Sequence, residues 1–178
     1  MEILKHYEPQ SEPEKLYKSQ MLELHEAKGQ LAFLRKSLNA HFTASAWIIN
    51  PETDTVLLIQ HKKLNKWLQP GGHADGEVNL EKVARKEAFE ETGLINLQLA
   101  SNSIFDIDIH LIPKNNQVPE HQHYDVRFVY FCRNTEETQI NSESINFQWL
   151  NIEDVKKLSN EPSVLRMVEK SKSILDEK

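Results

Sequence analysis

The spacing of apolar and polar residues predicts a helical segment near the start of the chain. Between about Pro13 and Leu38, apolar side chains recur three and four positions apart, as on one face of a helix, and Gly29 is a candidate break. The recurring residues are Leu24, Ala27, Leu31, Leu34 and Leu38. We expect this stripe to pack on the rest of the chain, because such a stripe is more often core than dimer interface.

The pattern then changes to the short apolar runs of β-strands. "HFTASAWIIN" (41–50) and "DTVLLIQ" (54–60) flank the turn-rich "NPETD", which predicts a hairpin. "KWLQPGG" ends in Pro70, Gly71 and Gly72, which interrupt regular structure and let a backbone approach a ligand closely. We therefore expect a loop at these residues.

Three further strands and two helical segments complete the pattern. "SIFDIDIHLI" and "HYDVRFVYF" alternate and are joined by the loop "PKNNQVPE", and "NFQWL" is a later strand. Helical spacing returns in "IEDVKKL" and "SVLRMVEKSKSIL". Without a repeat or an interdomain linker in the sequence, we predict one domain over residues 41–178 and a helical extension over residues 1–40 that packs on it.

A helix with well-marked limits lies between these strands. Asn79 is a candidate N-cap, and Gly93 supplies the left-handed residue that ends a helix after Thr92. With Leu80 at zero on a helical wheel, Phe89 falls at about 180°. We therefore expect the helix to be sandwiched, with packing on both sides.

Three acidic residues of this helix fall on its apolar side. Glu87, Glu91 and Glu90 lie at about 340°, 20° and 280° on the same wheel. Leu80, Val83 and Ala84 lie at about 0°, 300° and 40°, so the acids share their stripe, whereas a solvated face would be opposite it. Carboxylates on an inward face repel one another and lose hydration, which raised pKa values or a cation must relieve. Hard oxygen ligands suit Mg²⁺ or Mn²⁺, so we expect one of these ions.

The segment from Gly72 to Leu94 resembles the Nudix box. The box runs glycine, five residues, Glu, seven residues, then Arg-Glu-apolar-any-Glu-Glu-any-Gly-apolar, and alignment on Gly93 places its opening glycine at Gly72. Two positions depart from it, because Val78 stands at its first Glu and Lys86 at its Arg. The neighbouring Glu77 and Arg85 cannot simply substitute, since one residue turns a helical side chain by about 100°. The resemblance covers roughly residues 42–155.

The resemblance implies a Nudix-like α/β/α sandwich with a mixed sheet, and metal-dependent hydrolysis of a nucleoside diphosphate linked to another moiety. It implies Glu90 and Glu91 as the main metal ligands, with Glu87 assisting and the Gly71 carbonyl facing the metal. Lys86 keeps the positive charge of the box and can reach Glu90, but it lacks the planar fork of Arg. Activity is therefore expected to be reduced or altered.

Many Nudix relatives also use an acid on a late loop as ligand or general base. Glu143, in "NSESINFQW", is our candidate, and Glu136 and Glu137 are the alternatives. Trp67 and His73, on either side of the glycine loop, are candidates for contact with the base, sugar or phosphates of a substrate; packing is the alternative for Trp67 and closing the loop for His73. Gly72 lets the backbone approach the same substrate.

A second polar group alternates along two predicted strands. Its members are Asp106, Asp108 and His110 on one strand, and His121, His123, Asp125 and Arg127 on the next. Each set lines one face of its strand, so pairing of the strands brings them together. Such a cluster, with His110, His121, His123 and Arg127, suits a substrate phosphate, a second metal or a proton relay, although any solvated sheet face also alternates in this way.

Composition and charge exclude several classes of protein. Apolar residues at 39% and charged residues at 27% are those of a globular protein, and a net charge of −6 argues against a large nucleic-acid surface. A single cysteine, Cys132, excludes an intramolecular disulfide, and no apolar stretch has the length of a signal peptide or membrane span. We expect a cytoplasmic monomer or homodimer that binds a small nucleotide or diphosphate, with no nucleic acid or membrane as partner.

Two alternatives to the hydrolase remain open. Val78 and Lys86 are compatible with a Nudix-fold binding module that has lost turnover, whereas the retained Glu87, Glu90 and Glu91 favour an enzyme. A third possibility is isomerase chemistry on an isoprenoid diphosphate, which relatives perform with an added cysteine and glutamate. Cys132 alone, at the end of an apolar strand, gives this little support.

Overall fold

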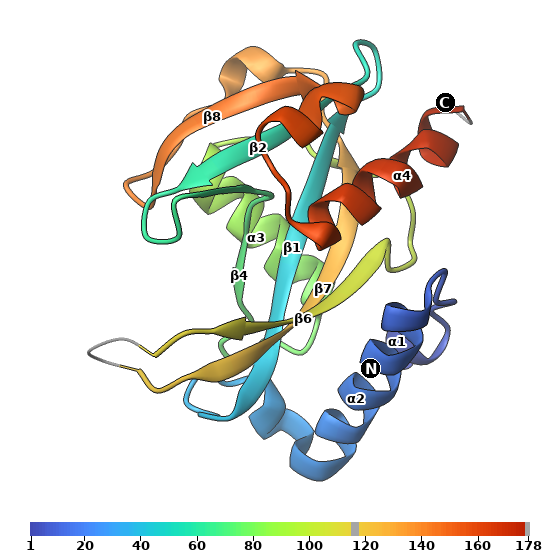
Figure 1. Cartoon of the computed structure of the whole chain (residues 1–178), viewed down its shortest axis with the longest axis vertical. Helices are drawn as coiled ribbons and strands as arrows, with labels where there is room; N and C mark the ends of the chain where they lie inside the picture. Colours follow the sequence, from blue (N-terminus) through green and yellow to red (C-terminus); the bar gives the residue numbers. More distant parts are fainter. Residues whose placement is uncertain (115–117, 177–178) are drawn as a thin grey trace.

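A computed structural model describes residues 1–114 and 118–176 (Figure 1). Its helices are α1 (Glu2–Lys5), α2 (Glu12–Lys28), α3 (Leu80–Thr92) and α4 (Pro162–Asp176), with 3₁₀ segments η1 (Gly29–Phe33), η2 (Thr135–Glu137) and η3 (Ile152–Lys157). Its strands are β1 (Ala40–Asn50), β2 (Thr55–His61), β3 (Lys66–Leu68), β4 (Gly71–His73), β5 (Gln98–Leu99), β6 (Asp106–Ile112), β7 (His121–Phe131) and β8 (Ser144–Asn151). Residues 115–117 of the predicted loop between β6 and β7 lie outside the described residues.

The strands form one mixed sheet, as predicted. β1 and β2 are the expected antiparallel hairpin, and β6 pairs antiparallel with β7. β1 runs parallel to β7 along ten registered pairs, from Ala40–Gln122 to Ile49–Phe131. The sheet order is β3-β2-β1-β7-β5, with β4 on β1, β6 on β7 and β8 on β2. Strand β1 is therefore the centre on which the other elements assemble.

Helices cover both faces of the sheet, which confirms the α/β/α sandwich. Alternate residues of β1 serve the two sides: Phe42 and Ala44 pack with α3, and Trp47 and Ile49 pack with α4. Figure 1 shows α3 behind β1 and α4 in front of it. Among the described residues, no helix combines the length and apolar character needed to cross a membrane.

The limits of α3 agree with the sequence prediction. The Asn79 side chain accepts hydrogen bonds from the backbone N–H groups of Glu81 and Lys82, at 3.1 and 3.3 Å. Gly93 ends the helix with φ +70°, a backbone conformation that side chains disfavour. The helix is thus held at both ends by local contacts.

The N-terminal helix is shorter than predicted. Helix α2 ends at Lys28, and Gly29 turns the chain with φ +54°, so the expected continuation to Leu38 is wrong. Leu31 and Leu38 of the predicted stripe are exposed, whereas Met21 and Phe33 are buried in the core beneath α3. The extension does pack on the domain, but through a different face. The division at residue 40 remains a prediction.

The predicted glycine loop is partly strand. β3 pairs with β2, and β4 pairs with β1 through Thr43–His73, Ala44–Gly72 and Ser45–Gly71. The backbone N–H and C=O groups along one edge of the N-terminal half of β1 pair with β4. The local sequence around the glycines does not show that these partners are available. Residues 71–73 are therefore fixed in position against the centre of the sheet.

A buried ionic network joins the N-terminal extension to α4. The Lys170 ammonium bonds the Glu14 carboxylate of α2 and Asp106 of β6, the latter at 2.8 Å. Asp106 also accepts from Arg166 at 2.8 Å and from Arg127 at 3.1 Å. The side chains of Lys170 and Glu14 are only 7% and 0% exposed, so each charge depends on its partners.

We expect Lys170→Met to lower the free energy of unfolding by about 3 kcal/mol or more, because it leaves two buried carboxylates short of a cation. Urea unfolding followed by circular dichroism measures this. Lys172→Met, two residues along α4, is the control: Lys172 is half-exposed and pairs with Glu169 on the surface, so its loss should cost under about 1 kcal/mol. Equal losses in the two variants would contradict the structural role of the network.

Candidate active site

Strand β4 and helix α3 meet where Gly72 faces Glu87. A Cβ atom on Gly72 would collide with the Glu87 carboxylate, so a side chain at this position would displace that carboxylate from its place beside β4. Gly71 is similarly confined, because a Cβ atom there would meet Ser45 of β1. The two glycines therefore let the backbone lie close to an acidic side chain; the predicted close approach to a ligand stays a prediction.

Glu91 is the most buried acid of the site, at 5% exposure. Its carboxylate accepts a 2.8 Å hydrogen bond from the backbone N–H of Gly71. Burial raises the pKa of Glu91 to about 7, and the nearby charges of Glu87 and Glu143 add to the shift, although the Gly71 bond opposes it. Glu91 is thus a carboxylate held in place with no cationic partner in residues 1–114 and 118–176.

The other two acids are joined through Lys86. Its ammonium lies 3.2 Å from Glu87 and 3.0 Å from Glu90, so the predicted contact with Glu90 is present. Glu87 is half-buried, and burial raises its pKa despite the hydrogen bond from Lys86. Glu90 is 48% exposed, so the expectation that all three acids share an inward face is wrong for Glu90. On the helical wheel, Glu90 lies at the edge of the apolar stripe, where the sheet does not cover α3.

The two departures from the box have different surroundings. Val78 is exposed, and the neighbouring Glu77 uses its carboxylate to accept from the backbone N–H of Asn79. Arg85 points away from the acids: it bonds Glu81 and stacks over Tyr130, 5.0 Å from the ring centroid. Arg85 therefore does not replace the missing arginine, as expected.

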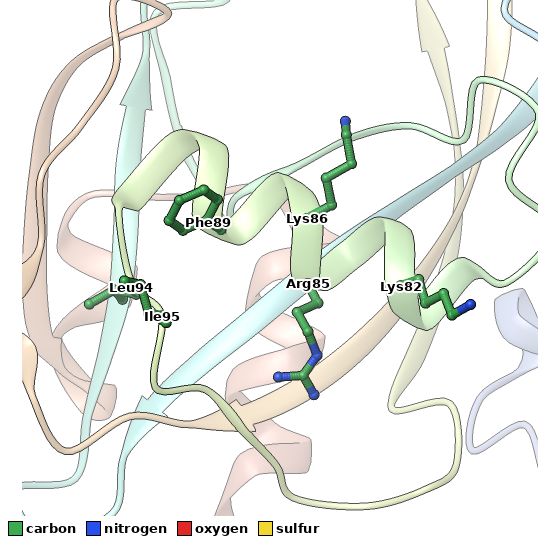
Figure 2. Close-up of a pocket in the computed structure, with 6 residues that line it drawn as sticks. All are labelled: Lys82, Arg85, Lys86, Phe89, Leu94 and Ile95. Atoms are coloured by element: carbon green, nitrogen blue, oxygen red, sulfur yellow. The ribbon is translucent and has the colours of Figure 1, made fainter.

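The outer side of α3 is open. A hollow of roughly 330 Å³ lies there (Figure 2), lined by Lys82, Arg85, Lys86, Phe89, Leu94 and Ile95. Phe89 is 52% exposed, so the expectation of a helix sandwiched between two layers is wrong. The hollow is separate from Glu91, which turns toward β4.

Glu143 is positioned by the loop before β8. The Asn141 side chain donates to the Glu90 carbonyl at 3.1 Å and accepts from the backbone N–H of Glu143 at 2.9 Å. The Gln139 N–H donates to the carbonyl of Thr92 at 2.8 Å. This loop is therefore tied to the end of α3, and the charge of Glu143 contributes to the raised pKa of Glu91.

The alternative acids and the lone cysteine lie elsewhere. Glu136 and Glu137 are exposed on η2, and their charges act on Cys132. Cys132 is 1% exposed, and burial raises the pKa of its thiol. A buried, protonated thiol is inert, which weakens the isomerase alternative.

The N-terminal extension contributes a residue that the sequence did not reveal. Arg35 bonds Asp75 at 2.6 Å, beside the loop that follows β4, and the backbone N–H of Gly76 donates to the Phe33 carbonyl at 2.9 Å. The bonds to Asp75 raise the pKa of Arg35, and the charges of Glu87 and Glu143 act in the same direction. Arg35 and Asp75 are forty positions apart in the sequence, so no local pattern predicts their contact.

The second polar group assembles as predicted and divides into two parts. Register pairs His110 with His123 and Asp106 with Arg127 across β6 and β7. His73 of β4 and His41 of β1 join the part that contains the histidines, and the centroids of these two rings lie 5.2 Å apart. The sequence analysis did not select His41, although its place beside the alternating polar residues of β1 was a signal.

Two predicted substrate contacts have the surroundings of packed residues. The Arg127 guanidinium is 3% exposed and bonds Asp106, Asp108 and Asp125, so its donors already have protein partners. Trp67 is partly buried against the core beneath α4. We do not include either of them in the site proposed below.

Comparison with known proteins agrees with this geometry. The family model described as NUDIX domain matches residues 39–170. Similar solved structures include a MutT protein from Methanosarcina mazei Go1 (TM-score 0.59, 19% identity, 79% of this chain and 96% of that chain). A second is the C. elegans Ap4A hydrolase in a binary complex (TM-score 0.56, 18% identity, 77% of this chain and 98% of that chain). A third is the E. coli dihydroneopterin triphosphate pyrophosphohydrolase (TM-score 0.57, 15% identity, 72% of this chain and 92% of that chain).

At these identities the structural likeness shows the fold alone, and no protein in the curated set matches the sequence. The family model, in contrast, spans most of the chain and includes the whole box from Gly72 to Leu94. The chain therefore belongs to the Nudix family.

Proposed function

We propose that this protein is a metal-dependent hydrolase that cleaves a phosphoanhydride bond in a nucleoside diphosphate linked to another moiety. The observation that carries the proposal is the buried Glu91 carboxylate, fixed by the Gly71 N–H beside the half-buried Glu87. Strongly shifted carboxyl groups in a confined site are typical of catalytic centres. The names of two similar structures, an Ap4A hydrolase and a triphosphate pyrophosphohydrolase, support this substrate class.

The residues of the site fit Mg²⁺ or Mn²⁺. Glu91 has a desolvated charge and no cation, so a divalent ion would relieve the burial that raises its pKa. Glu90 and Glu91 would hold the ion, with Glu87 assisting and the Gly71 carbonyl as a further oxygen. When bound, the metal would neutralise diphosphate charge and activate the attacking water.

The chain's own residues would then orient and deprotonate the water. Glu143 accepts its proton, the water oxygen forms a bond to phosphorus, and the bridging P–O bond breaks with its electron pair leaving on the departing phosphate. Gly72, which has no side chain, would let the phosphates of the substrate lie close to β4. Lys86 holds Glu87 and Glu90 in place through its two ion pairs, and Arg35 is held by Asp75 beside the loop that follows β4.

A binding module without turnover is the second candidate, and the surroundings of Val78 and Lys86 favour it. The exposed Val78 offers no carboxylate at the first acidic position of the box. Lys86 bridges two acids with single contacts, whereas Arg would hold them with a planar fork.

Cytoplasmic location and a monomeric or homodimeric state remain proposals from the sequence.

Without metal, the contribution of Glu91 to stability should fall as pH rises. Glu91 has a pKa raised from 4.5 to about 7, so the folded chain binds the extra proton, and this stabilisation is lost as pH rises through 7. Without divalent ions, Glu91→Gln should become more stable relative to wild type as pH rises. The free energy of unfolding of the variant minus that of wild type should grow by at most about 3 kcal/mol between about pH 5 and about pH 8. Urea unfolding in a chelator measures it. Glu90→Gln is the matched control in the same helix, and a pH-independent difference for Glu91→Gln would refute the burial argument.

Hydrolysis should require both metal and Glu91. Nucleotide sugars, dinucleotides and nucleoside triphosphates are assayed with and without Mg²⁺ or Mn²⁺ by release of phosphate-containing products. Glu91→Gln should lower kcat/KM by about a hundredfold or more, because the metal supplies several kcal/mol in the transition state. Glu81→Gln, an acid on another side of α3, should retain activity. Tight binding of a substrate without turnover would instead identify the binding module.

Glu143→Gln should lower kcat by about 10²–10⁴-fold, because the general base is lost. Its KM and its metal affinity should change little. Glu136→Gln and Glu137→Gln are the controls, since both acids lie away from α3 on η2. A wild-type kcat for Glu143→Gln would assign the base to another residue.

A further inference from the structure

Five of the eight histidines gather on one face of the sheet, at the end where β1 begins. His41 of β1 stands in register with His123 of β7, which stands opposite His110 of β6. The centroids of neighbouring rings lie 4.9–5.4 Å apart, joining these three to His73 and His121. The phosphoanhydride mechanism uses none of these rings.

Three of the histidines present nitrogens to a common point. The ligand atoms of His41, His121 and His123 all lie within 4.8 Å of one another, and they are the one such group of three among residues 1–114 and 118–176. Without an ion, one of the two Nε2 atoms of His121 and His123 donates a hydrogen bond to the other, and an ion would displace that proton; the two nitrogens are 3.2 Å apart. This is close to the roughly 3.3 Å between two nitrogens that share a tetrahedral zinc ion at its usual bond length.

Backbone carbonyls determine which nitrogen of two rings carries the proton. His121 Nδ1 lies 2.8 Å from the Pro119 carbonyl, and His41 Nδ1 lies 3.3 Å from the Ser37 carbonyl. A carbonyl only accepts, so each Nδ1 is the protonated donor and each Nε2 carries the free lone pair. Histidine ligands of metals are held in this way by carbonyl partners.

His41 shows that the group is incomplete without a ligand. The residue is 1% exposed, and its Nε2 is buried with no hydrogen-bond partner among the described residues. Leaving a buried polar atom unsatisfied costs about 1–3 kcal/mol, so a ring with no role there would be disfavoured.

We propose that His41, His121 and His123 form a binding site for a transition-metal ion of the zinc class. Imidazole nitrogens suit Zn²⁺, and three of them leave a fourth position for water or for His110, whose Nδ1 is held by Asp108 at 3.2 Å. Mg²⁺ and Mn²⁺ prefer oxygen ligands, so this site is chemically distinct from the carboxylates.

The site and the carboxylates lie on opposite faces of β4. Gly72 faces Glu87, and the next residue, His73, faces the histidines, with its ring 5.2 Å from that of His41. A bound ion would link β1 to β7 at their first residues, where the β6–β7 hairpin projects from the sheet (Figure 1). It would therefore stabilise the start of the central strand, and it does not depend on the proposed hydrolysis.

Zinc titration of the full chain without an affinity tag tests the site. A chromophoric chelator competes for Zn²⁺, and we expect one equivalent to bind to the protein and to raise its Tm. Co²⁺ in place of Zn²⁺ should give the visible absorption of a tetrahedral nitrogen-ligand site. His121→Gln and His123→Gln should each weaken binding by more than about a hundredfold, since loss of groups that merely orient a ligand costs up to about that much.

Two controls separate this site from others. His6→Gln, on the exposed end of α1, should leave zinc affinity unchanged, and so should Glu91→Gln, which removes the proposed Mg²⁺ ligand. Failure of hydrolysis in the assay above leaves these measurements unaffected. Absence of stoichiometric binding by the wild-type chain, a Co²⁺ spectrum without tetrahedral character, or full binding by folded His121→Gln would each overturn the proposal.

Discussion

Desolvation of the Glu91 carboxylate is the constraint around which the site is built. A charged group at 5% exposure is unfavourable unless a donor or cation faces it, and the Gly71 N–H supplies one hydrogen bond. That bond requires β4 to lie beside α3, and the missing side chain of Gly72 leaves room there for the Glu87 carboxylate. Pairing of β4 with β1 and the two caps of α3 then hold the backbone and the helix in this relation.

Two sets of buried acids in this protein differ in how their charge is balanced. Burial would raise the pKa of Glu14, but hydrogen bonds from Lys170 and Tyr7 outweigh it and lower the pKa to about 2. Burial prevails at Glu91, whose pKa is about 7. The first arrangement is complete within the chain and joins α2 to α4, as a structural element does. At Glu91, no cation among the described residues balances the charge, as is typical of the ligands of a metal site.

Alternation along short strands lets one backbone serve two kinds of chemistry. In β4, Gly72 faces the carboxylates of α3 while His73 faces the histidines of β1 and β7. Oxygen ligands on one side and nitrogen ligands on the other select different metal ions. The same alternation in β1 directs Phe42 toward α3 and His41 toward the histidines, so the central strand separates the two sites.

Local sequence was sufficient for the elements whose signals lie within a few residues: the alternating strands, the capped helix from Leu80 to Thr92, and the spacing of the Nudix box. Contacts between distant segments decided the rest. Glu90 is exposed and Glu91 buried because β4 covers only part of α3, and Asn141 brings Glu143 to that helix. Arg35 and His41 joined their clusters through partners that periodicity cannot identify. The physical reason is that spacing reports which face of an element a side chain occupies, whereas burial and charge depend on what packs against that face.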